Sequence, residues 1–105
     1  MNRSTIYDFL VKETDLKYTF TYISGGKYVV FPVPYDWDHS YLMINSMRVT
    51  DFQSIILFTN ELVVRFDVRG TEQINIPYKD IEYLEVMEDM DIHYIGLHEG
   101  KKVYH

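Results

Sequence analysis

Residues 53–68 read QSIILFTNELVVRFDV, which is two apolar runs with a short polar interruption. Asn60-Glu61 suits a two-residue turn, because Asn tolerates a positive φ. The position of this turn determines which residues lie opposite each other in the hairpin. Residues that lie opposite each other have their side chains on the same face of the sheet. The predicted partners are Leu57 with Val64 and Ile55 with Phe66. We therefore expect a β-hairpin with one face in the core.

A third strand follows this hairpin. A three-residue loop at 69–71, with Gly70 at a positive φ, sets Phe66 opposite Ile74 and keeps the core face apolar. After Pro77 the spacing of apolar residues fits a strand over 81–87. The same residues also fit a helix over about 79–90, and the sequence leaves both open.

The chain ends in another predicted hairpin, in which residues 92–97 fold back on 102–105 through a turn at 98–101. The edge left by these two strands is compatible with a homodimer. At the other end of the chain, Ser4 is the predicted N-cap of an amphipathic helix that runs to about Thr14. Three further strands are expected at 16–23, 27–31 and 41–49.

These elements predict an α+β fold, in which an N-terminal helix packs on a bent antiparallel β-sheet of six to eight strands. The sheet is expected to form a roll or a small, partly open barrel. The residues expected in its core are Phe9, Leu10, Tyr18, Phe20, Val30, Ile55, Leu57, Val64, Phe66, Ile74, Ile76, Ile81 and Ile95.

The composition is that of one globular domain over residues 1–105, with 47% hydrophobic and 25% charged residues. The absence of cysteine excludes disulfides, thiolate catalysis and thiolate zinc sites. No apolar run approaches the roughly 20 residues that span a bilayer. We expect a soluble, cytoplasmic protein with no membrane partner.

Negative charge is concentrated in the second half of the chain. Residues 51–105 carry five basic and eleven acidic side chains, so they hold the whole net charge of -6. The residues 80–91 contain no Lys or Arg, and the predicted partner-binding acids among them are Asp80, Glu82, Glu85, Glu88, Asp89 and Asp91. Such a surface repels phosphates, so we expect no direct nucleic-acid binding and, instead, docking to a basic protein surface. A solvated outer face is the plainer interpretation of the same residues.

The least regular stretch is 32–41, where Pro32 and Pro34 exclude a central strand. It contains the only Trp, and large aromatic side chains often anchor protein interfaces. The predicted contact residues here are Tyr35, Asp36, Trp37, Asp38 and Tyr41. The competing interpretation is that Trp37 closes the end of the sheet as a core residue.

No pattern of residues indicates catalysis. Asp36, Asp38 and His39 have the donor atoms of a cation site, but the Gly and distal Glu of a calcium loop are missing, so we predict no metal. No nucleophile motif, zinc-protease motif or Gly-rich phosphate loop occurs. We expect no catalytic residues, no cofactor and no enzyme activity.

Residues 62–86 pass from the strand LVVRF to the segment NIPYKDIEYLEV. This order of a strand, a turn after Pro77 and a second strand resembles bacterial pleckstrin-homology-like domains, and it is also similar to the last strands of small Sm-like barrels. The resemblance implies a strongly bent antiparallel sheet or a partly open barrel. A pleckstrin-homology-like domain would close with a C-terminal helix, whereas this chain predicts a hairpin there.

These observations favour a small acidic, non-catalytic protein-binding module, which acts as an adaptor or inhibitor through segment 33–41 and segment 80–91. Three alternatives stay open. They are a phage-type inhibitor that mimics nucleic acid, a small barrel that binds a ligand, and a small metal-dependent hydrolase.

Overall fold

The computed structural model describes residues 1–13, 19–23, 26–33, 40–67, 69–88 and 95–104. In these ranges the chain forms one α-helix, one 3-10 helix and ten strands. The bounds are α1 Arg3–Glu13, β1 Thr19–Ile23, β2 Gly26–Pro32, β3 Ser40–Ile44, β4 Met47–Val49, β5 Ser54–Leu57, β6 Glu61–Arg65, β7 Gln73–Pro77, η1 Tyr78–Asp80, β8 Tyr83–Glu88, β9 Ile95–His98 and β10 Lys101–Tyr104.

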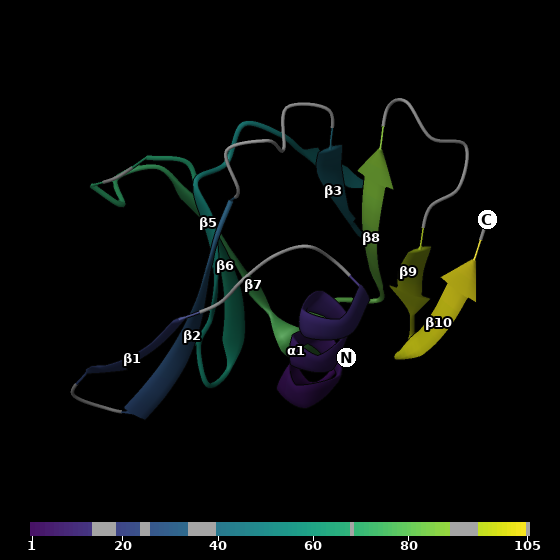
Figure 1. Ribbon diagram of the computed structural model, residues 1–105, viewed down its shortest axis with the longest axis horizontal. Coiled ribbons are helices and arrows are strands. Elements are labelled where there is room, and N and C mark those ends of the chain that lie inside the picture. The colour runs from purple at the N-terminus through teal and green to yellow at the C-terminus, as the bar shows by residue number, and fades with distance from the viewer. Residues whose placement is uncertain (14–18, 24–25, 34–39, 68, 89–94, 105) are drawn as a thin grey trace.

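The strands form two antiparallel sheets, which we call sheet A (β1-β2-β5-β6-β7) and sheet B (β10-β9-β8-β3-β4). Figure 1 shows α1 between the lower ends of the two sheets. Side chains of α1 and of both sheets form one core cluster. The predicted α+β class, with an N-terminal helix on antiparallel strands, is confirmed; the described residues form ten strands in two sheets, where one sheet of six to eight strands was predicted.

The apolar face of α1 is the predicted one, because Ile6, Phe9 and Leu10 are fully or almost fully buried. The predicted N-cap at Ser4 is wrong. The helix begins at Arg3, so Asn2 is the capping residue. Its Oδ1 accepts hydrogen bonds from the Thr5 backbone nitrogen at 2.8 Å and from the Thr5 hydroxyl at 2.7 Å.

The β5–β6 hairpin forms, but its predicted register is wrong by two residues. Leu57 lies opposite Leu62 and Ile55 opposite Val64, because the turn is at Thr59-Asn60. The β6–β7 register differs in the same way, with Val64 opposite Ile74. A shift of two residues leaves every side chain on its predicted face. Gly70 has the expected positive φ, 73°.

The strand interpretation of segment 81–87 is confirmed by β8, which pairs with both β3 and β9. The terminal hairpin also forms, with its turn at Glu99-Gly100, where both φ angles are positive. Since β9 lies between β8 and β10, β10 is the edge strand of this hairpin, and β4 is the other edge of sheet B. The predicted strand 41–49 is itself a hairpin, because it turns at Asn45-Ser46 between β3 and β4.

Most of the predicted core residues with described side chains lie in or against the core. Phe9, Leu10, Ile55, Leu57, Val64 and Ile81 are buried, Phe66 and Ile76 are partly buried against them, and Ile74 is half-buried. The prediction that Val30 is a core residue is wrong. Its neighbours Val29 and Phe31 point into the core in its place. Tyr18 and the side chains of Phe20 and Ile95 lie outside the described residues.

Candidate functional site

The two predicted contact segments adjoin the same end of one strand pair. Segment 33–41 leads into β3, segment 80–91 contains β8, and the two strands pair with Ser40 opposite Glu88. Tyr35, Asp36, Trp37, Asp38, Asp89 and Asp91 lie outside the described residues, as does the side chain of Glu88. The strand pairing therefore joins the described ends of the two segments, through residues that are 48 positions apart in the sequence.

One face of β3, β4 and β8 points away from the core and carries charged and aromatic groups. Met43 lies between Arg48 and Glu85 in the strand register. The guanidinium carbon of Arg48 is 4.0 Å from the centre of the Tyr41 ring, which is a cation–π contact. We call the side chains Tyr41, Met43, Arg48, Tyr83, Glu85 and His98 the outer face of sheet B.

Glycine at position 96 makes room for Glu85 on this face. Gly96 lies opposite Glu85 on β9, and a Cβ atom there would come within 2.5 Å of the Glu85 Cγ. Any other residue would therefore displace the carboxylate side chain. Glu85 is half-buried and is the one predicted acid that the described structure holds in the middle of the outer face.

Tyr83 and His98 form a stacked pair at the other end of the same face. Their ring centres are 4.1 Å apart and their planes differ by 6°. Tyr83 is 37% exposed, more than any other large hydrophobic side chain among the described residues. An exposed ring with one face already supported is a suitable contact point for a partner.

Asn45 holds the start of the acidic segment in place. Its Oδ1 accepts hydrogen bonds from the backbone nitrogens of Glu82 (2.8 Å) and Tyr83 (3.1 Å), and its Nδ2 donates to the carbonyl of Asp80 (2.9 Å). Asp80 and Glu82 are consequently exposed at the end of β8 opposite to Glu88. The acidic residues thus extend along the whole strand, which at about 3.3 Å per residue is roughly 17 Å.

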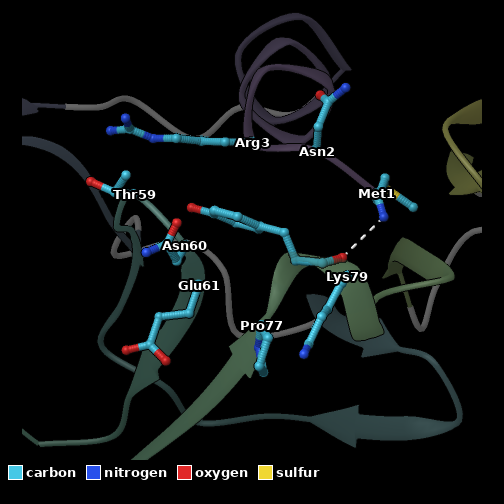
Figure 2. A pocket seen from close by; sticks show the side chains of 9 residues that line it. Met1, Asn2, Arg3, Thr59, Asn60, Glu61, Pro77 and Lys79 are labelled. Atoms are coloured by element: carbon cyan, nitrogen blue, oxygen red, sulfur yellow. Dashed lines mark hydrogen bonds between the residues drawn. The ribbon is translucent and has the colours of Figure 1, made fainter.

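A hollow of about 660 Å³ lies between the start of α1, the β5–β6 turn and η1 (Figure 2). Tyr78 lines this hollow, and its hydroxyl donates to the carbonyl of Phe58. The terminal nitrogen of Met1 donates to the carbonyl of Tyr78 at 2.9 Å, and Arg3 donates to that of Leu57 at 3.2 Å. Burial raises the pKa of Tyr78 above its ordinary value of 10.0.

Several polar side chains that line the hollow are hydrogen-bonded within the chain. Asn2 caps the helix, and Glu61 accepts a hydrogen bond from Asn75 at 3.0 Å. In the described part of the chain no side-chain polar atom is both buried and without a hydrogen-bond partner.

Within the described ranges, no group of three or more His, Asp or Glu side chains is placed to hold a metal ion. The one α-helix among these residues is too short to cross a membrane. No protein-family model, no curated protein and no solved structure matches this chain.

Proposed function

We propose that the chain is a small, non-catalytic protein-binding module, an adaptor or inhibitor, whose contact surface is the outer face of sheet B with the two segments that adjoin it. The observation that supports this most directly is the pairing of Ser40 with Glu88. It joins the aromatic segment and the acidic segment, which the sequence alone gives no reason to bring together.

The chemistry of this face favours a partner with a basic surface. Tyr83 supplies an exposed aromatic group and Glu85 supplies negative charge on this face, and the exposed Glu82 adds negative charge at the start of the acidic segment. Aromatic side chains contribute much of the energy of an interface, while complementary charge mainly raises the association rate. Arg48 and Lys101 also lie on this face, so the complementarity is local and the partner needs an acidic or neutral patch as well.

The proposal is tested by capturing proteins from the source cells with the tagged chain at low and high salt. Wild type should retain a specific protein, and Tyr83→Ala, Glu85→Gln and Trp37→Ala should each weaken its capture. Glu72→Gln is the matched control, because it removes the same charge from an exposed loop of sheet A. Added salt should lower the affinity, since surface charges are screened.

Two results would contradict this proposal. Capture of the same protein by all variants would exclude the outer face of sheet B as the contact surface. An affinity independent of salt would exclude the basic partner. A large loss of thermal stability in Trp37→Ala would instead identify Trp37 as a core residue.

A further inference from the structure

Strand β7 is an edge of sheet A, with β6 on one side and no described strand on the other. The backbone bonds at its two ends show which groups face β6. Phe66 donates to the carbonyl of Glu72 at 2.9 Å, and Tyr78 donates to that of Asn60 at 3.2 Å. Backbone groups alternate in direction along an antiparallel strand, so every second residue between Glu72 and Tyr78 also bonds to β6.

The residues in between direct their backbone groups away from the sheet. By this alternation Ile74 and Ile76 bond to β6. The outward groups belong to Gln73, Asn75 and Pro77, and both polar residues are exposed. Proline has no N–H, so Pro77 contributes a carbonyl only. The donors on the outer edge of β7 are therefore the N–H groups of Gln73 and Asn75.

The sequence of β7, QINIP, has none of the charged side chains that protect many edge strands. On sheet B, the edge strand β4 is three residues long with Arg48 at its centre, and the edge strand β10 begins with Lys101 and Lys102. The side chains of β1, the other edge of sheet A, lie outside the described residues. Two chains of net charge -6 can therefore meet at β7 without like charges on the paired strands.

One register lets β7 pair with a second copy of itself and use every outward donor. With a twofold axis at Ile74, Gln73 of each copy lies opposite Asn75 of the other, and each pair exchanges backbone hydrogen bonds in both directions. An axis at Asn75 would instead set Gln73 opposite Pro77, which cannot donate to the Gln73 carbonyl. The position of Pro77 thus favours the axis at Ile74.

The side chains of β7 match one another in the same register. Gln73 donates from Nε2 to the Asn75 Oδ1 at 3.0 Å, and Asn75 donates from Nδ2 to the Glu61 Oε1 at 3.0 Å. Side-chain amides both donate and accept, so the amides of the two copies can bond across the axis. On the core face Ile74 is half-buried, and it would lie directly opposite Ile74 of the other copy. Pairing would bury the apolar surface that remains on this residue.

We propose that two copies of the chain pair antiparallel through β7, with the twofold axis at Ile74, and join their copies of sheet A into one continuous sheet. Two short strands form a small interface, so the dimer is weak and its population depends on concentration. The pairing uses sheet A and leaves the outer face of sheet B uncovered. The dimer therefore presents that face twice and holds a partner with two sites more tightly than the monomer does.

The dimer is tested by sedimentation velocity of the full chain at concentrations up to about 1 mM. Wild type should pass reversibly from monomer to dimer as the concentration rises. NMR spectra over the same range should show saturable shifts of the Gln73 and Asn75 amides. A chain that stays monomeric would overturn the proposal. Shifts confined to β1, β4 or β10 would also overturn it, because they would place the contact at another edge.

A charge exchange at the axis tests the register. Ile74→Lys sets two ammonium groups opposite each other and Ile74→Glu sets two carboxylates, so each variant alone should dimerise at least about tenfold more weakly than wild type. An equimolar mixture of the two should recover the dimer, because the paired charges are then opposite. Wild-type-like dimerisation of either variant, or a mixture that fails to associate, would overturn the axis at Ile74.

The matched control is Ser46→Lys, which adds the same charge at an exposed turn of sheet B. It should dimerise like wild type, and weakening equal to that of Ile74→Lys would show that net charge, not β7, governs association. Urea denaturation establishes that each variant is folded. The amide shifts of wild type test the contact independently of any substitution.

Discussion

Tyr78 and Tyr83 lie five positions apart in one segment and occupy opposite environments. Tyr78 is 7% exposed, belongs to the core cluster and donates its hydroxyl hydrogen to the carbonyl of Phe58. Tyr83 is 37% exposed and stacks on His98 outside the core. Tyr78 therefore stabilises the fold, whereas Tyr83 is exposed and available to a partner.

The largest effect should follow Tyr78→Ala, which removes a buried ring from the junction of α1, the β5–β6 turn and η1. We expect a loss of about 3–4 kcal/mol in the free energy of unfolding, measured by urea denaturation. Tyr78→Phe keeps the ring and removes only the hydrogen bond to Phe58, so it should cost about 1 kcal/mol. If Tyr78→Ala cost no more than Tyr78→Phe, the ring would not be a core element.

Asn45→Ala should have the second largest effect, about 2 kcal/mol, measured in the same way. Asn45 has φ 56° and its side chain bonds to three backbone groups of residues 80–83. Asn45→Gly loses those bonds but tolerates the backbone angle, so it should cost about 1 kcal/mol. Equal losses would mean that the backbone angle contributes little.

Alkaline pH should lower the stability of the fold through Tyr78. Burial raises the pKa of folded Tyr78 above 10.0, with a smaller contribution from Glu61 and an opposing one from Arg3. Above pH 10 the unfolded state loses this proton and the folded state keeps it, so stability falls as the pH rises. The extra loss should be about 1.4 kcal/mol by pH 11. It is measured as the difference in unfolding free energy between wild type and Tyr78→Phe across pH 9–11, and parallel curves would contradict it.

The sequence predicts faces better than registers, and the two sheets show why. Turns at Thr59-Asn60 and at Asn60-Glu61 both suit the β5–β6 hairpin, and they differ by two residues in register. Both leave Ile55 and Val64 on the core side, so apolar patterning cannot distinguish them. In β2 the run from Tyr28 to Phe31 is apolar on both faces, and only contacts with the rest of the core place Val29 and Phe31 inward.

The candidate site was predicted in part. Patterning and charge identified Tyr41 and Glu85, which the structure brings to one face. The sequence analysis missed Asn45 and Gly96. Asn45 bonds to backbone groups that are 35 or more residues away in the sequence. Gly96 matters only because β9 places it opposite Glu85 of β8. Asn-Ser between two apolar runs was the one local signal for the turn at Asn45. Tyr83 and His98 become partners only through the β8–β9 register.

The smallest effect on stability should come from the Tyr83–His98 pair. A double-mutant cycle with Tyr83→Ala and His98→Ala should give a coupling of about 0.5–1 kcal/mol, because the rings stack in parallel but remain partly in water. Tyr83→Ala alone should therefore destabilise the fold far less than Tyr78→Ala, while weakening partner capture more than any variant in the core that remains folded. A stability loss as large as that of Tyr78→Ala would instead make Tyr83 part of the scaffold, and the outer face of sheet B would lose its exposed aromatic contact.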